Sequence, residues 1–394
     1  MWRWHRPLSV GAFGLYATVA SSPTSRDSDW IVRVGLEQAA WAPTIYVSVS
    51  GDALQWIDPN TGAVLGHGDP LQVWQVQRVG DRLIAQHGKR RIVAARLVAQ
   101  PAGAGVVQVG ATPHTMRRYR GHLEWVERNG KLLTLNWVRL DDYLKATLPR
   151  EMPPNFHPEA LKAQAIAARS FTLRRLNRHR QWGYDLCDHA PCQVYGGVEA
   201  EHPHTNAAVD ATAGEVLVFE GRVLDAVYTG NCGGHTAPIE VAMSGTRSIA
   251  PLRGVPDTDA NGMPYCRIAP NHYWELHLSV DELSRCFPEV GRVRAVQVLQ
   301  RAPSGHVLQV GVRGARAEKQ VAGAQFRHLL GATRVRSLMF DIQPEGNGWK
   351  LLGRGWGHGA GMCQWGAQAR ARAGQNYLQI LQAYYPDATV QRPR

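Results

Sequence analysis

One glutamate in this chain stands where its carboxyl group could do acid–base chemistry. Glu151 lies in the stretch LPREMPPNF, and the two prolines that follow it cannot continue a helix. Proline fixes its own φ and restricts the residue before it, so the segment is stiff and fixes the direction of the carboxylate. A carboxyl group held in this way can give a proton to a leaving oxygen and take one from a hydroxyl. The alternative is a structural ion pair between Glu151 and a nearby cation.

The helix predicted after this loop carries two cations on a largely apolar surface. Residues 161–173 are mostly Ala, Leu, Ile and Phe, and a helix that is apolar on most sides is buried on most sides. Lys162 and Arg169 are seven residues apart, close to two turns, so they project from the same face. Buried cations need a partner or a purpose. The two side chains therefore either pair with Glu151 or face a ligand.

A run of alternating glycines near the C-terminus carries a histidine. In GRGWGHGAGMCQWGA, residues 353–367, glycine alternates with Arg, Trp, His and Ala, and His358 lies in the middle. No frame gives G-x-G-x-x-G before a helix and no Lys-Ser/Thr follows, which excludes a dinucleotide fingerprint and a P-loop. Each glycine costs conformational entropy, so the run indicates a ligand close to the backbone, a strained turn or close contact between two elements. MCQWGAQARARAGQ then predicts a helix ending near Gly374, so His358 precedes a helix N-terminus, as a site residue or as a core histidine.

Six cysteines leave both disulfide bonds and metal binding open. In an exported protein the disulfide pairings to expect first are Cys187–Cys192 and Cys232–Cys266. The metal alternative rests on Cys187, His189 and Cys192, which lie within six residues, and on Cys232 with His235 in a C-x-x-H arrangement. Zinc sites usually show two clear pairs of ligands, and this pattern is looser.

Length and charge indicate a multi-domain protein with an anionic partner. The 394 residues suffice for two or three domains, and Lys and Arg exceed Asp and Glu by 12. Such a charge favours nucleic acid, anionic lipid or an acidic polysaccharide. No nucleic-acid-binding motif accompanies it, so nucleic acid is not the expected partner. Arg3 and Arg6 precede the moderately apolar residues 8–19, a pattern typical of a weak secretory signal or short anchor, and we expect export to the cell envelope or periplasm.

The elements that must position these residues are mostly strands. Alternating apolar residues predict a strand at 31–38, and turn signals such as Asn129-Gly130 predict hairpins from 46 to about 145. Residues 155–180 contain the clearest helix, with Pro158 in its first turn. The sequence therefore predicts an α+β fold that is rich in β-structure and has one long buried helix. The expected parts are a signal or anchor at 1–29, a β-rich region at 30–115 and a larger domain at 116–394.

Three separated motifs carry a resemblance to a known family. EMPPNFHPEALKAQAIAARSFTL, DAVYTGNCGGHTAP and GRGWGHGAGMCQWGAQ occur in that order over roughly residues 120–390. Together they resemble the SpoIID/LytB family, the stage II sporulation D proteins and amidase enhancers of bacteria. The resemblance implies a SpoIID-type catalytic domain at 116–394, with an active-site groove between two lobes. It also implies the activity of the characterised members, lytic transglycosylases that cleave peptidoglycan glycan strands lacking stem peptides.

The resemblance assigns roles to residues of all three motifs. Glu151 falls on the catalytic acid/base. The expected substrate-binding residues are Lys162, Arg169, Tyr228, Trp356, His358 and Gln364, of which Trp356 would offer its ring to a sugar face. The glycine motif would form the far wall of the groove.

Two positions depart from the family pattern, and both involve cysteine. Asn231-Cys232 precedes Gly233-Gly234 where serine or threonine is common, and Cys363 stands where serine is common. Some relatives bind zinc through His and Cys near the active site, at a spacing that does not map cleanly onto Cys187 and Cys192. No cofactor is therefore assigned, zinc stays open, and the candidate ligands are Cys187, Cys192 and His235.

One glutamate is enough for the implied reaction. Ordinary glycosidases use two carboxylates, and the matched motifs hold no partner for Glu151. In a lytic transglycosylase the C6 hydroxyl of the substrate attacks C1 and gives a 1,6-anhydro-muramyl product. We expect at least Arg169 to face the substrate, because a bidentate arginine fits the lactyl carboxylate of N-acetylmuramic acid. The competing function is a non-catalytic modulator that binds cell-wall glycan or an amidase and stimulates the amidase.

Overall fold

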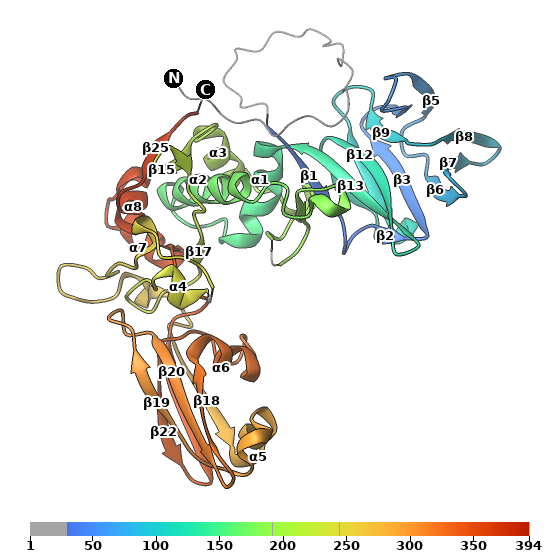
Figure 1. Ribbon diagram of the computed structural model, residues 1–394. Coiled ribbons are helices and arrows are strands. Elements are labelled where there is room, and N and C mark those ends of the chain that lie inside the picture. The colour runs from blue at the N-terminus through green and yellow to red at the C-terminus, as the bar shows by residue number, and fades with distance from the viewer. Residues whose placement is uncertain (1–29, 191, 244, 394) are drawn as a thin grey trace. The chain divides into compact units, whose positions relative to one another are not determined.

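The structure, a computed structural model, describes residues 30–190, 192–243 and 245–393 (Figure 1). The chain divides into two compact units. The first consists of the residues up to Glu151 together with Arg175–Glu201, and the second of Met152–Arg174 together with the residues from His202 onward. Within the described ranges, no helix is both long and apolar enough to cross a membrane. The expected export segment, 1–29, lies outside them.

Two sheets form the framework of the first unit. The larger one is antiparallel except between its first two strands, and its order is β14 (Leu186–Cys187), β1 (Ile31–Gly35), β13 (Lys131–Arg139), β12 (His122–Arg128), β9 (Val98–Pro101), β4 (Leu54–Ile57) and β5 (Val64–Gly68), with β2 (Trp41–Ala42) also paired to β13. The second sheet is antiparallel, in the order β11 (Arg117–Tyr119), β10 (Val106–Gly110), β3 (Thr44–Ser50), β6 (Trp74–Val79), β7 (Arg82–His87) and β8 (Arg90–Ala94). Buried tryptophans fill the core, and the rings of Trp56 and Trp74 are 5.5 Å apart.

The strand elements of the first unit follow the sequence pattern closely. The predicted strand at 31–38 is β1, and the predicted hairpin joins β12 to β13 with Arg128 opposite Lys131. Both turn residues have left-handed φ, 53° for Asn129 and 70° for Gly130, as a type I′ turn requires. Both predictions are therefore confirmed.

The main difference from the predicted elements is α1 (Leu140–Glu151), part of which the sequence pattern assigns to the β-rich region. The helix forms because its apolar side chains recur every three or four residues, the period of one helical face. The buried positions are Leu140, Tyr143, Leu144, Ala146, Thr147 and Leu148. Glu151 is consequently the last residue of a helix, and the expectation that it lies in the proline loop is wrong.

The second unit is built around the predicted long helix, α2 (Pro158–Arg174). Pro158 opens the helix, and twelve of its residues are buried, from Ala160 to Thr172. It contacts α3 (Pro203–Ala211), α7 (Gln364–Arg372), α8 (Tyr377–Tyr384) and β15 (Val216–Phe219). The last of these belongs to a three-stranded sheet with β16 (Arg222–Val223) and β25 (Thr389–Gln391). A buried helix in this unit and a helix after Met362 are both confirmed.

The same unit contains a β-rich region between residues 273 and 354 (Figure 1). One sheet has the order β18 (Tyr273–Ser279), β23 (Gly348–Arg354) and β22 (Phe340–Glu345), and another has β19 (Val293–Arg301), β20 (Val307–Gly314) and β21 (Glu318–Ala322). Stacked rings of Phe287, Phe326 and Phe340 lie in the core between these strands and the helices α5 (Val280–Cys286) and α6 (Gly323–Leu330).

The fold is therefore a mixed one rich in β-structure, as predicted. The sequence places a boundary at residue 115, whereas the first unit extends to Glu151, because β12 and β13 pair within its larger sheet. The groove between two lobes stays a prediction.

Candidate functional site

In the first unit, the Glu151 carboxyl is held by the chain that returns past α1. The side chain is half-buried at the end of the helix, and its Oε1 accepts a hydrogen bond from the Val194 amide at 3.3 Å. Two turns earlier, the fully buried Tyr143 donates from its hydroxyl to Gln193 Oε1 at 3.3 Å. The ring of Tyr143 also lies 5.0 Å from that of Tyr195. The segment around residue 194 is therefore fixed against α1, and with it one oxygen of the carboxyl group.

A cluster of metal-ligating side chains lies in the same unit. The ligand atoms of His179, Cys187 and Cys192 all lie within 4.8 Å of one another, and His179 Nε2 is 3.3 Å from Cys192 Sγ. Cys187 is buried on β14, whereas the other two side chains are half-buried. The His179 ring is stacked on Tyr184 at 5.0 Å, which fixes its plane. We call these three residues the HCC cluster.

The donor set of the HCC cluster suits zinc. Two sulfurs and one imidazole nitrogen are ligands that zinc prefers, and three protein ligands leave a fourth position open in a tetrahedral site. A hydrogen bond from Cys192 lowers the pKa of the Cys187 thiol to about 5, although burial acts in the opposite direction. The thiolate that a metal needs is thus favoured at one ligand before any ion binds.

The pKa of Tyr143 is affected by Glu151 and by the HCC cluster alike. Burial raises the pKa of the tyrosine well above its usual value, and the charges of Cys192, Glu151 and Cys187 add to this effect. These charges act on Tyr143 only because they lie near it. The expected acid/base and two ligands of the HCC cluster therefore share one electrostatic environment within the first unit.

The structure brings two of the predicted metal ligands together and leaves the predicted histidines apart from them. Cys187 and Cys192 lie together, but the neighbouring histidine is His179, because His189 turns to Asp188, with Nδ1 3.2 Å from Oδ1. The signal in the sequence is a histidine eight residues before the first cysteine, a longer spacing than that of His189. His235 belongs to neither metal-type cluster in the described ranges and hydrogen-bonds through Nδ1 to Thr236 O at 2.8 Å.

Neither predicted disulfide is formed. All six cysteines are free thiols in the structure, including the pairs Cys187–Cys192 and Cys232–Cys266. The sulfurs of Cys232 and Cys266 lie 3.8 Å apart, well beyond the ~2.05 Å of a disulfide bond.

The two cations of α2 have partners inside the second unit. Lys162 Nζ pairs with Glu159 Oε1 at 2.7 Å, one turn earlier on the same helix. Arg169 has no exposed surface, and its guanidinium donates to Glu215 O at 3.1 Å and to Val209 O at 3.3 Å. The expectation that Arg169 faces substrate is wrong: its donors satisfy backbone carbonyls that packing has removed from water.

The central motif and the glycine motif come together in the second unit. Here β17 (Tyr228–Thr229) pairs in parallel with β24 (Met362–Cys363), and Asn231 exchanges two backbone hydrogen bonds with Trp356, at 2.9 and 2.7 Å. A side chain on Gly361, whose φ is 69°, would place its Cβ 1.8 Å from the carbonyl oxygen of Val227. Close contact between two elements is therefore one demand that the glycine run answers.

The predicted binding residues of these motifs divide into buried and accessible ones. Tyr228 packs on Phe171, with ring centroids 5.8 Å apart, and the buried Gln364 donates to Gln164 Oε1 at 3.3 Å. His358 is half-buried and accepts a hydrogen bond from the Ala360 amide through Nδ1 at 3.1 Å.

Trp356 is the most accessible predicted binding residue of the glycine motif. Its side chain is 41% exposed, and the Arg336 guanidinium lies 4.7 Å from its ring centroid. Arg336 belongs to none of the three motifs, so no sequence signal marks it. The pair presents an aromatic face and a cation to solvent, a combination suited to an anionic sugar.

The chain resembles known families and proteins. Residues 128–219 match the family described as Stage II sporulation protein (SpoIID), and residues 274–361 match a domain of unknown function, DUF8618. An uncharacterized protein of Brachyspira hyodysenteriae is 31% identical over 272 residues, which cover 68% of this chain and 70% of that protein. Stage II sporulation protein D of Bacillus amyloliquefaciens is 29% identical over 271 residues, 64% of this chain and 74% of that protein. The amidase enhancer of Bacillus subtilis is 28% identical over 292 residues, 63% of this chain and 40% of that protein's length.

Proposed function

Because the chain belongs to the SpoIID/LytB family, we propose that it is a lytic transglycosylase, which cleaves peptidoglycan glycan strands lacking stem peptides. Family membership supports a role at the cell wall. The proposal of transglycosylase activity rests on the surroundings of Glu151, a half-buried carboxyl group with one oxygen fixed by the Val194 amide. A fixed carboxyl group can be aimed at a reacting oxygen without reorganisation.

In the proposed reaction Glu151 acts twice. It first protonates the glycosidic oxygen, so that the bond between C1 and this oxygen breaks and the leaving sugar takes the proton. The C6 hydroxyl of the N-acetylmuramic acid residue then attacks C1, and the Glu151 carboxylate accepts the hydroxyl proton. The product ends in a 1,6-anhydro-muramyl residue, and Glu151 is again protonated. The reaction therefore consumes no water and needs no second carboxylate.

The donor set of the HCC cluster fits zinc, and a zinc ion there would support the catalytic group without taking part in the reaction. His179, Cys187 and Cys192 would hold the ion, which would supply a positive charge near Tyr143. The ligand Cys192 lies two residues before Val194, whose amide holds Glu151. Metal binding would therefore also stiffen the segment that orients the carboxyl group.

The second unit contributes glycan-binding groups in this proposal. The exposed ring of Trp356 can lie against a sugar face, and Arg336 beside it can pair with a lactyl carboxylate. His358, which is half-buried and lies two residues after Trp356, can form a hydrogen bond with the glycan. The excess of 12 positive charges favours the same polyanionic glycan, and we propose that the protein is exported to reach it.

One observation favours the competing function, an amidase modulator that binds glycan without cutting it. The cations expected to face substrate, Lys162 and Arg169, are engaged within the second unit, whereas Trp356 is exposed and Arg336 beside it is half-buried. A protein with these features could hold glycan or an amidase even if Glu151 were inactive. The similarity to an amidase enhancer is in keeping with this alternative.

A comparison of variants separates the two functions. Wild-type protein, Glu151→Gln and the control Glu127→Gln, whose carboxylate is exposed on β12, are incubated with peptide-free glycan strands, and anhydro-muramyl ends are counted by mass spectrometry. We expect product from the wild type and the control, and about 10²–10⁴-fold less from Glu151→Gln. If the wild type gives no product but binds glycan or stimulates an added amidase, the protein is a modulator and the proposed enzymatic function is wrong.

A further inference from the structure

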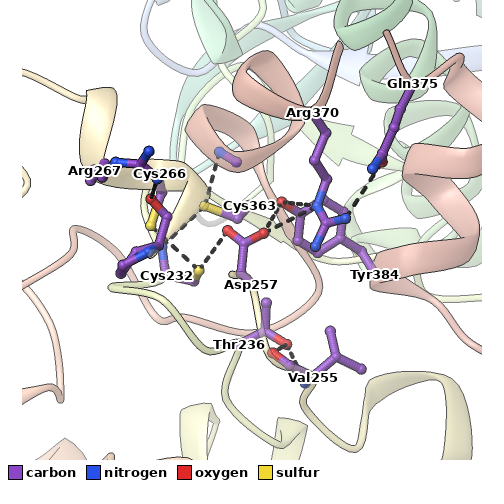
Figure 2. Close-up of polar contacts among 12 residues, drawn as sticks. Cys232, Thr236, Val255, Asp257, Cys266, Arg267, Cys363, Arg370, Gln375 and Tyr384 are labelled. Atoms are coloured by element: carbon purple, nitrogen blue, oxygen red, sulfur yellow. Dashed lines mark hydrogen bonds and ion pairs between the residues drawn. The ribbon is translucent and has the colours of Figure 1, made fainter. Parts of the chain in front are cut away.

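A second cluster of metal-ligating side chains lies in the second unit, and none of its residues has been assigned to catalysis or glycan binding. Cys232, Asp257, Cys266 and Cys363 bring their ligand atoms within 4.8 Å of one another (Figure 2). All four side chains are buried, with exposed fractions of 0–1%. They come from four separate segments: the chain after β17, the loop before residue 264, a 3₁₀ turn at Tyr265–Ile268 and the end of β24. We call these residues the buried cluster.

The distances within the buried cluster match those of a tetrahedral zinc site. Cys232 Sγ lies 3.8 Å from Cys266 Sγ and 3.3 Å from Asp257 Oδ2. Zn–S bonds of about 2.3 Å at tetrahedral angles separate two sulfurs by about 3.8 Å. With a Zn–O bond of about 2.0 Å, the corresponding sulfur–oxygen separation is about 3.5 Å. Cys232, Cys266 and Asp257 therefore stand close to the separations that an ion would require, and the ligand atom of Cys363 lies within 4.8 Å of all three.

Groups around the buried cluster hold its ligands in place. Asp257 Oδ1 accepts hydrogen bonds from Tyr384 Oη at 2.7 Å and Arg370 Nε at 3.2 Å, which leaves Oδ2 on the side of the sulfurs (Figure 2). Cys363 Sγ accepts from the amides of Cys232 at 3.2 Å and Gly366 at 3.4 Å. Such outer hydrogen bonds orient the ligands of metal sites and stabilise thiolates.

Gly366 gives a second, independent sign that Asp257 must approach this closely. The residue lies inside α7, where glycine costs about 1 kcal/mol relative to alanine. A Cβ at this position would lie 2.1 Å from Tyr384 Oη and 2.3 Å from Asp257 Oδ2. The helix therefore accepts a weak helix former so that the carboxylate and its tyrosine can pack against it.

Burial makes the cluster costly unless something compensates its polar groups. Three thiols and a carboxyl group have left water, and Arg370 is the one cation that ion-pairs with them in the described ranges. A disulfide between Cys232 and Cys266 would use two of the four groups, and it would not explain why the Cys363 thiol and the second oxygen of Asp257 are buried beside them. A divalent ion accounts for all four.

We propose that Cys232, Asp257, Cys266 and Cys363 bind one zinc ion. Because all four ligands come from the protein and are buried, the site has no open position, so it is structural and takes no part in glycan cleavage. The ion would join the central motif, the loop 255–268 and the start of α7, and thus hold the glycine motif in place. The cysteines would lose their thiol protons to solvent on binding.

The test must separate this site from the HCC cluster. Zinc is measured by mass spectrometry in purified full-length wild type, in Cys187→Ser/Cys192→Ser, and in the control Cys286→Ser, whose thiol belongs to neither cluster. We expect the HCC double variant to keep one zinc per chain, and the control to match the wild type. X-ray absorption of the double variant should show three sulfur scatterers and one oxygen.

Two outcomes would overturn the proposal. One is a folded double variant that contains no metal and binds no added zinc or cobalt; the other is a Cys232–Cys266 disulfide found by non-reducing peptide mapping of the protein as isolated. Substitution of a ligand can prevent folding, so Tyr384→Phe serves as a milder variant. It removes one hydrogen bond to Asp257, and we expect zinc affinity to fall about 10-fold in competition with a chelator. An unchanged affinity would argue against Asp257 as a ligand.

Discussion

The HCC cluster and the buried cluster use similar ligands in opposite surroundings. The HCC cluster has three candidate ligands, two of them half-buried. The charges of its cysteines and the charge of Glu151 all raise the pKa of Tyr143. The buried cluster has four ligands, all removed from solvent and tied to neighbouring helices by hydrogen bonds. Ligand type alone therefore does not tell the purpose of a site. Burial and the number of protein ligands are the grounds on which we assign the proposed chemistry to the first unit and the proposed structural zinc site to the second.

The sharpest test of this contrast is Glu151→Gln, which should affect activity and leave stability alone. Loss of one acid/base group lowers turnover of glycan strands by about 10²–10⁴-fold. The unfolding midpoint in urea should stay within error, because the side chain is half-buried and the amide can still accept from Val194. Turnover and unfolding are measured on the same preparation. A large fall in stability would place Glu151 among the structural residues.

Cys363→Ser should show the reverse pattern. Loss of a zinc ligand from a closed site is among the changes that cost about 4 kcal/mol or more in the free energy of unfolding. The matched control Cys286→Ser should cost little, because that thiol is half-buried and outside both clusters. Equal stability of the two variants would remove the distinction between the sites.

Gly361→Ala should also destabilise the second unit, by about 3 kcal/mol. The new side chain needs a left-handed φ of 69° and would collide with the carbonyl of Val227. Gly374→Ala is the control, because Gly374 has a φ of 90° but a Cβ added there would meet nothing within 4 Å, so only the strain of about 1 kcal/mol applies. Urea unfolding of both variants gives the difference due to contact.

Acid should weaken the second unit through His306, which packs beside Gly359 of the glycine run. Burial, with the charges of His235 and Arg354, lowers the pKa of His306 to about 3. The unfolded chain therefore binds this proton below about pH 6.5 while the folded chain does not, so stability is complete above pH 6.5 and is lost as the pH falls toward 3. Between pH 7 and pH 5 the loss is about 2 kcal/mol. Urea unfolding at both pH values checks this, and His306→Gln should abolish that share of the loss.

The smallest expected effect is that of Trp356→Ala. Loss of one exposed ring that stacks on a sugar should weaken glycan binding by about 1 kcal/mol, close to five-fold, with little change in stability. Trp182→Ala is the control in the first unit, since Trp182 is also partly exposed and lies 4.5 Å below an arginine, Arg128. Equal loss of binding in both variants would mean that exposed tryptophans contribute without specificity.

Much of the fold could be predicted from local pattern. The Asn129-Gly130 turn and the apolar run of α2 each dictate one backbone geometry, because few other conformations suit those residues. The helix α1 could not be predicted in the same way, because its apolar spacing follows directly on that of β13 and the pattern changes period without a turn signal. The position of Glu151 at a helix end follows from that helix.

The candidate site was predicted less completely, because it depends on contacts between distant segments. The apolar pattern of α2 predicts that Arg169 is buried, but only packing against Val209 and Glu215 shows that its guanidinium donates to two backbone carbonyls. His179 lies outside the short spacing that marks metal ligands in sequence, and it lies beside the cysteines where the chain folds back to pair His179 with Tyr184. Arg336 belongs to no motif and is found only by its place over Trp356.

By itself the sequence determined the family, the catalytic candidate, the long helix and the steric demand of the glycine run. Each of these follows from residues that are close in sequence, because their types restrict the backbone conformation or form a motif. The tertiary structure decided which cysteines share a site, that Asp257 joins three of them, and that one predicted substrate ligand is a buried support. Those relations span up to 131 residues, as between Cys232 and Cys363. No local pattern encodes them, because they arise only when the core closes and brings the segments together.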